Sequence, residues 1–166
     1  MVETGEQAPD FTVPKAGGTV YNDVESFTLS NALGDGPVVL AFVPAAFTGG
    51  CTAEMCAFRD SMSIFNDLDA RVYGISVDLP FAQNVWMQEH DLTFPMLSDW
   101  NHDVIERYGV VRENMYGLFN VAKRSIFVLD SDGVVTYKWV RDGDNPAFET
   151  FIPGLEAELE RIADAD

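Results

Sequence analysis

The sequence predicts one α/β domain in which a mixed central β-sheet is flanked by helices. Two observations predict this class. Short apolar runs without polar alternation, the pattern of strands buried on both faces, alternate with segments in which apolar residues recur every three or four positions. Two β-rich runs near the end flank a turn and add an antiparallel hairpin. With 166 residues, 47% of them apolar, and no linker or repeat, we expect a single domain over residues 1–166.

The first buried strand is predicted over residues 37–43, an apolar run that Pro44 ends. After a turn, apolar residues recur from Cys51 onward at spacings of four and three, which predicts an amphipathic helix ending near Leu68. Three elements then follow in order. They are a strand over 71–77, a helix over 81–90 and a short strand over 94–97.

A short helix is predicted over residues 101–108, followed by an irregular stretch over 110–121. Two β-rich runs, 125–129 and 134–140, then flank Asp130-Ser131-Asp132-Gly133, a composition typical of a hairpin turn. The segment 147–165 is helical in pattern despite Pro153. A thioredoxin-like fold fits this order of elements.

Acidic residues dominate the charge of the chain. There are 27 Asp and Glu against 10 Lys and Arg, which leaves a formal net charge of -17. So few scattered cations argue against nucleic acid and anionic membrane surfaces as partners. The acids are spread among apolar runs, so they coat a folded surface. Because only Lys15, Lys123 and Lys138 are lysines, this surface resembles that of halophilic proteins, and we expect salt to stabilise the fold.

Neither a bilayer-spanning apolar stretch nor a secretory signal pattern is found in the sequence, so we expect a cytoplasmic protein. Two cysteines, Cys51 and Cys56, are its only thiols. Cys51 follows a buried strand through a Gly49-Gly50 turn and opens a helix. Free N–H groups and the positive end of the helix dipole favour a thiolate there, and the thiolate is the nucleophilic form. The alternative for either cysteine is a thiol that only packs in the core.

The pattern Pro44-x-x-x-Thr48-x-x-Cys51 resembles the active-site signature of the peroxiredoxins. Phe47, Glu54 and Arg124 also fall where that family places its supporting residues. The resemblance covers nearly the whole chain, from Gly5-x-x-Ala8-Pro9-x-Phe11 through Arg59-Asp60 to the Arg124–Asp130 run. The spacing of the two cysteines is like the bacterioferritin-comigratory (Q) type, whereas Ala46-Phe47-Thr48-Gly49 looks like the alkyl hydroperoxide reductase E type.

The resemblance implies a thioredoxin-like fold with a peroxiredoxin-type N-terminal extension and a peroxidase that needs no bound cofactor or metal. Cys51 would attack a peroxide and become a sulfenic acid. Thr48 would hydrogen-bond the peroxide, Arg124 would stabilise the thiolate and the developing alkoxide, and Pro44 would shield the site. Glu54 would orient an arginine, with Phe47 as a supporting residue. On the residues alone, Thr48 can instead cap the helix and Arg124 can be a surface cation.

Cys56 is the candidate resolving cysteine, which would form a disulfide with Cys51. Five helical residues separate their Cα atoms by about 8.7 Å, beyond the roughly 4.4 to 6.8 Å of a disulfide, so the first turns of the helix would have to unwind. Without a resolving role for Cys56 the mechanism would use one cysteine.

The resemblance implies hydrogen peroxide and small organic hydroperoxides as substrates and a thioredoxin-like or other thiol reductant. Family members occur as monomers, dimers and larger rings, and among these states a homodimer is the expectation for this chain. The competing hypothesis is a redox-sensing or interaction module switched by oxidation of Cys51.

Overall fold

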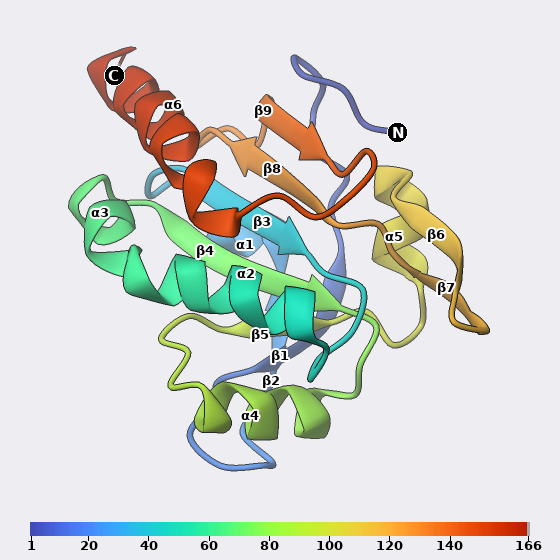
Figure 1. Ribbon diagram of the computed structural model, residues 1–166. Helices are drawn as coiled ribbons and strands as arrows, with labels where there is room; N and C mark the ends of the chain where they lie inside the picture. Colours follow the sequence, from blue (N-terminus) through green and yellow to red (C-terminus); the bar gives the residue numbers. More distant parts are fainter. Residues whose placement is uncertain (166) are drawn as a thin grey trace.

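A seven-stranded mixed sheet forms the centre of the protein, in the strand order β2-β1-β5-β4-β3-β8-β9 (Figure 1). The computed structural model describes residues 1–165. β3 pairs in parallel with β4, and β4 with β5, whereas the other neighbours are antiparallel. The strands of this sheet are β1 (Thr12–Ala16), β2 (Val24–Thr28), β3 (Val38–Phe42), β4 (Arg71–Ser76), β5 (Met96–Ser98), β8 (Ser125–Leu129) and β9 (Val135–Val140).

Helices cover both faces of the sheet, as the alternation along β3 requires. Val39 and Ala41 belong to a core shared with α2, α3, α4 and α6, and Leu40 and Phe42 to a second core shared with α1 and α5. Figure 1 shows α2 and α4 on one side of the sheet and α5 on the other. The helices are α1 (Leu29–Ala32), α2 (Gly49–Asp60), α3 (Met62–Asp67), α4 (Pro80–Glu89), α5 (Asp103–Tyr108) and α6 (Ile152–Ala165), with a 3₁₀ turn, η1, at Phe148–Thr150. No helix among the described residues is long and apolar enough to cross a membrane.

The single helix predicted from Cys51 to Leu68 is two helices. α2 begins two residues earlier, at Gly49, and Ser61 interrupts the helix with a φ of -106° and a ψ of 5°. The apolar spacing continues across the break because both helices bury their stripes in the same core. The last helix begins at Ile152 rather than at 147, which puts Pro153 in its first turn, where a missing N–H costs nothing.

The stretch over 110–121, predicted to be irregular, is a hairpin of β6 (Val111–Met115) and β7 (Leu118–Ala122). Its two-residue turn is Tyr116-Gly117, both with positive φ (54° and 85°). This is the turn type that right-twisted hairpins favour. Sequence patterns missed it because Tyr-Gly is not a usual turn pair, β6 is mostly polar, and β7 exposes Leu118 and Phe119, so neither strand alternates regularly between apolar and polar residues. The β1–β2 hairpin was also missed, and it forms the N-terminal extension that the resemblance implied.

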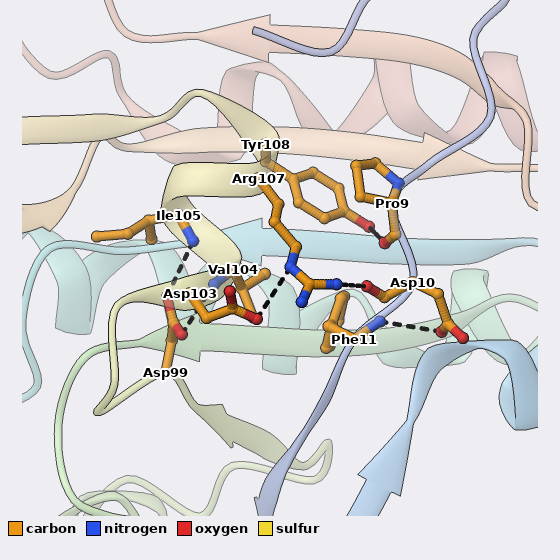
Figure 2. Close-up of polar contacts among 9 residues, drawn as sticks. All are labelled: Pro9, Asp10, Phe11, Asp99, Asp103, Val104, Ile105, Arg107 and Tyr108. Atoms are coloured by element: carbon orange, nitrogen blue, oxygen red, sulfur yellow. Dashed lines mark hydrogen bonds and ion pairs between the residues drawn. The ribbon is translucent and has the colours of Figure 1, made fainter.

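The start of the short helix α5 is held by a buried carboxylate. Asp99 accepts hydrogen bonds from the N–H groups of Val104 and Ile105, at 3.0 and 2.9 Å (Figure 2). Burial raises the pKa of Asp99, against the lowering effect of these two bonds. At the other end of α5, Arg107 and Tyr108 donate to the carbonyl groups of the segment that precedes β1. The helix therefore connects the end of β5 to the N-terminal segment.

Candidate active site

A cavity of about 430 Å³ opens where β3 ends and α2 begins, and Cys51 lies in its wall. The Cys51 side chain is only 1% exposed and its thiol is free. Four of the residues predicted for the site, Pro44, Thr48, Cys51 and Arg124, line this one cavity. The other lining residues are Gly49, Gly50, Arg112, Met115, Tyr116, Arg141 and Asn145.

The loop between β3 and α2 is fixed by its own hydrogen bonds. The Ala46 N–H donates to the Asp78 carboxylate at 2.8 Å, and the Thr48 hydroxyl donates to the Ala45 carbonyl at 2.8 Å. Thr48 is the N-cap residue of α2 by position, but its side chain makes no capping hydrogen bond, so the predicted alternative of a cap is wrong. The first helical bond runs from the Thr52 N–H to the Thr48 carbonyl, which leaves the N–H of Cys51 among the free donors of the helix start.

Arg124 organises the buried side of the cavity. It is 4% exposed, so it is not a surface cation, and its Nη2 lies 3.3 Å from the Sγ of Cys51. Nη1 donates to the Glu54 carboxylate at 2.9 Å, and Nε donates to the Asn145 side chain at 3.1 Å. The guanidinium also lies over the ring of Phe148, 5.1 Å from its centroid. These contacts hold the positive charge of Arg124 against the sulfur.

Glu54 is the charge partner of Arg124 and is completely buried. Burial raises the pKa of Glu54 to about 7, and the neighbouring Arg124 acts in the opposite direction. One carboxylate oxygen, Oε1, has no hydrogen-bond partner among the described residues. A carboxylate with an orphaned oxygen is poorly solvated, which agrees with the raised pKa.

Gly50 explains how Arg124 and Asn145 approach the start of α2. A Cβ atom at this position would lie 2.7 Å from Nδ2 of Asn145 and 3.1 Å from Nη2 of Arg124. A larger residue would therefore push both side chains away. Sequence reasoning missed Asn145 and Phe148, because they follow β9 in a segment that carries no motif.

Three predicted residues lie outside the cavity wall: Glu54, which reaches the site through Arg124, and the more distant Phe47 and Cys56. Phe47 has a φ of 65°, is 51% exposed and places its ring 6.4 Å from that of Trp86, so it contacts α4. Cys56 is half-buried in the unbroken helix α2 that also carries Cys51, and both thiols are free. A disulfide between Cys51 and Cys56 would therefore require part of α2 to unwind. No cluster of three potential metal-ligating His, Cys, Asp or Glu occurs in residues 1–165.

Comparison with known proteins places this geometry in a family, since the model of the AhpC/TSA family matches residues 4–138. The chain is a peroxiredoxin of this family. The peroxiredoxin is 34% identical over 139 residues to alkyl hydroperoxide reductase E of Mycobacterium bovis, covering 82% of this chain and 84% of that protein. It is 36% identical over 140 residues to the bcp protein of Coxiella burnetii, covering 83% and 88%.

Among solved structures, peroxidoxin BcpB from Mycobacterium tuberculosis superposes on this peroxiredoxin with a TM-score of 0.83 at 34% identity, over 98% of this chain and 99% of that one. The fold is thus thioredoxin-like, as predicted. As a peroxiredoxin, the protein is a thiol-dependent peroxidase, an oxidoreductase that uses peroxide substrates and a thiol reductant. Both named types that the sequence resembled, bacterioferritin-comigratory and alkyl hydroperoxide reductase E, occur among its relatives.

Proposed function

We propose that Cys51 is the peroxidatic nucleophile that reduces hydrogen peroxide and small organic hydroperoxides. Its thiolate attacks the terminal peroxide oxygen. An S–O bond forms, the O–O bond breaks, and the departing alkoxide or hydroxide takes up a proton to leave as alcohol or water. The observation that carries this proposal is the Arg124 guanidinium 3.3 Å from Sγ in the cavity. A cation at that distance stabilises the thiolate and the negative charge that develops on the leaving oxygen.

The other cavity residues complete the donor and acceptor set. The proton of Thr48 is committed to the Ala45 carbonyl, so its oxygen is available to accept a hydrogen bond from the peroxide. The Cys51 N–H supplies a donor at the helix start. Pro44 is buried and shields the sulfur from bulk water. Glu54 acts through Arg124 as a positioning residue, and Phe47 supports the loop through Trp86.

Stopped-flow measurement of intrinsic fluorescence during peroxide addition tests the role of Cys51. The Cys51→Ser variant is expected to lose peroxidase activity and the fluorescence change together. Arg71→Gln is a suitable control, because it removes one cation that pairs with Asp35 far from the cavity. Full peroxidase activity in Cys51→Ser would contradict the proposal, and so would a wild-type rate no faster than that of free cysteine.

Cys56 resolves the sulfenic acid in this scheme. Its thiolate attacks the Sγ of Cys51, an S–S bond forms, the S–O bond breaks, and the departing hydroxide takes up a proton to leave as water. Because α2 holds the two Cα atoms about 8.7 Å apart, the first turns of the helix must unwind before the bond forms. Mass spectrometry after one equivalent of peroxide distinguishes the mechanisms. A disulfide in the wild type and a persistent sulfenate in Cys56→Ser are expected, whereas a stable sulfenate with a free Cys56 thiol in the wild type means a one-cysteine mechanism.

A thioredoxin-like dithiol would then reduce the disulfide and return both cysteines to thiols. This cycle suits a reducing compartment, and we assign the protein to the cytoplasm. The acidic coat, with a charge of -17, suits a cytoplasm of high salt concentration. Reduction of the oxidised protein by thioredoxin but not by a monothiol of equal concentration is the expected result.

The proposed homodimer uses an exposed apolar face beside the active-site loop. Leu79, Trp100, Leu118 and Phe119 are 41 to 71% exposed and line a groove of about 370 Å³ together with Pro44 and Ala45. Two chains of charge -17 repel each other, so a mainly apolar face, in which Asp78 is the one carboxylate of the groove lining, is where they can meet. Sedimentation velocity is expected to give a dimer for the wild type and a monomer for Phe119→Asp. A monomeric wild type would refute the dimer.

A further inference from the structure

Within residues 1–165, three cations of this acidic protein have no carboxylate partner. Seven of the ten Lys and Arg side chains form ion pairs within residues 1–165. The remaining three are Arg112, Lys123 and Arg141, which have none there although acids outnumber cations by 27 to 10. The acids in the same segments, such as Glu113 and Asp142, are exposed and form no ion pair with them. Because carboxylates are so abundant in this chain, the absence of a partner for these three cations requires an explanation.

All three lie at one place in the fold. Together with Arg124 and Gly143 they line a cavity of about 200 Å³. Arg112 lies on β6, Lys123 follows β7, and Arg141 follows β9. Backbone hydrogen bonds fix their relative positions, because the Arg141 N–H donates to the Arg124 carbonyl at 2.9 Å and the Lys123 N–H to the Val110 carbonyl at 2.6 Å. The three cations therefore lie around one cavity, on backbone segments that are hydrogen-bonded to their neighbours.

This cationic cavity adjoins the Cys51 cavity. Arg112, Arg124 and Arg141 line both, so a molecule in the Cys51 cavity can extend one end among the cations. Arg141 donates its Nε to the Gly143 carbonyl at 2.8 Å, and no protein group accepts from its Nη atoms among the described residues. Such a fork of donors matches the two oxygens of a carboxylate.

The size of the Cys51 cavity indicates a substrate larger than hydrogen peroxide. A water molecule occupies about 30 Å³ in the liquid, and hydrogen peroxide is only about twice as large. The cavity of about 430 Å³ leaves most of its space to the rest of a substrate. Met115 and Tyr116 contribute apolar side chains to the wall of this cavity.

We propose that Arg112, Lys123 and Arg141 form a subsite for the carboxylate of an organic hydroperoxide whose peroxide group reacts at Cys51. This inference names a substrate class and rests on the proposed role of Cys51. An anion approaching a protein of charge -17 is repelled at most of the surface, so a local cluster of free cations selects where it binds. Hydrogen peroxide carries no charge and gains nothing from this cluster.

The test uses a straight-chain ω-hydroperoxy carboxylic acid and its methyl ester, which differ in charge and by one methyl group. Stopped-flow fluorescence gives the second-order rate constant of Cys51 oxidation for each. In the wild type the acid is expected to react about tenfold faster than the ester, which corresponds to about 1.4 kcal/mol. In Arg112→Gln this ratio is expected to fall to near one. Arg71→Gln makes the same change in net charge at a remote ion pair and is expected to keep the wild-type ratio.

Three results would overturn the subsite. They are equal rates for acid and ester in the wild type, an unchanged ratio in Arg112→Gln, and an equal loss of the ratio in Arg71→Gln. A further outcome would refute the hydroperoxide assignment. If the acid and the ester oxidise Cys51 at equal rates, but an anionic thiol reduces the oxidised protein faster than a neutral thiol does, the cations bind the thiol reductant.

A binding measurement separates failure of the subsite from failure of the proposed function. The matching ω-hydroxy acid cannot be reduced, and titration calorimetry is expected to show that it binds the wild type about tenfold more tightly than Arg112→Gln. Absence of Cys51 oxidation by hydrogen peroxide would refute the proposed function alone. Absence of a difference in hydroxy acid affinity would refute the subsite alone.

Discussion

Replacing Glu54 by Gln is expected to remove a pH dependence of stability that this one carboxyl group causes. Burial raises the pKa of Glu54 from its ordinary 4.5 to about 7 in the folded protein. Between these pH values the folded protein holds a proton that the unfolded chain has released, so the free energy of unfolding falls as the pH rises. Below about pH 4.5 Glu54 is protonated in both states, so its ionisation does not affect stability. Above about pH 7 it is ionised in both states, and the folded protein bears the full cost of burying the charge.

The magnitude follows from the width of that interval. Each pH unit is worth about 1.4 kcal/mol, so ionisation of Glu54 lowers the free energy of unfolding by about 3 kcal/mol between pH 4.5 and 7. Gln keeps the oxygen that accepts from Arg124 but cannot ionise. The wild type is therefore expected to lose about 3 kcal/mol more stability than Glu54→Gln over this interval.

Urea unfolding at half-unit pH steps measures the effect. Both proteins carry Cys51→Ser, so that the thiol beside Arg124 is absent from both and only residue 54 differs between them. Exposed Glu25, replaced by Gln, is a matched control that is expected to leave the pH profile within error. Parallel profiles for the wild type and Glu54→Gln would refute the reasoning, because they would mean that the folded environment does not disfavour the Glu54 charge.

Three further outcomes are expected. Asp99→Ala removes the acceptor at the start of α5 and lowers the free energy of unfolding by about 1–2 kcal/mol in urea; unchanged stability would mean that water replaces the carboxylate. Asn145→Ala frees Nε of Arg124 and slows Cys51 oxidation about tenfold in stopped flow, and an unchanged rate would show that Glu54 suffices. The melting temperature rises between dilute buffer and 1 M KCl, where the Debye length falls to about 3 Å, and indifference to salt would refute the halophilic interpretation.

Sequence patterns predicted the buried parts of the fold and missed the exposed ones. The strands β3 and β8 were predicted nearly to the residue, because strands buried on both faces are continuous apolar runs. The half-buried β9 was found from its β-branched and aromatic residues after a turn sequence. In the β6–β7 hairpin, β6 is mostly polar and β7 exposes two large apolar residues, so the side chains carry no periodic signal. Its formation depends on the Tyr116-Gly117 turn and on backbone pairing.

The site was predictable as far as the motif extended. Pro44, Thr48, Cys51 and Arg124 lie together because the loop after β3 and the start of β8 are adjacent in the sheet. The partners of Arg124 beyond Glu54 were not predictable, since Asn145 and Phe148 reach it from a segment that has no fixed spacing to the motif. The raised pKa of Glu54 depends on complete burial, which only the packing of α2 against the sheet decides.

The β6–β7 hairpin lines the Cys51 cavity but is not part of the central sheet. Within the described residues its strands pair only with each other, whereas the seven-stranded sheet is complete without them. Yet the hairpin supplies Arg112, Met115 and Tyr116 to the wall of the Cys51 cavity. Arg112 and Tyr116 lie in the cavity wall but in neither buried core, whereas Ala122 belongs to the core. A laboratory library that aims to change the hydroperoxide accepted by this enzyme would therefore begin at Arg112 and Tyr116.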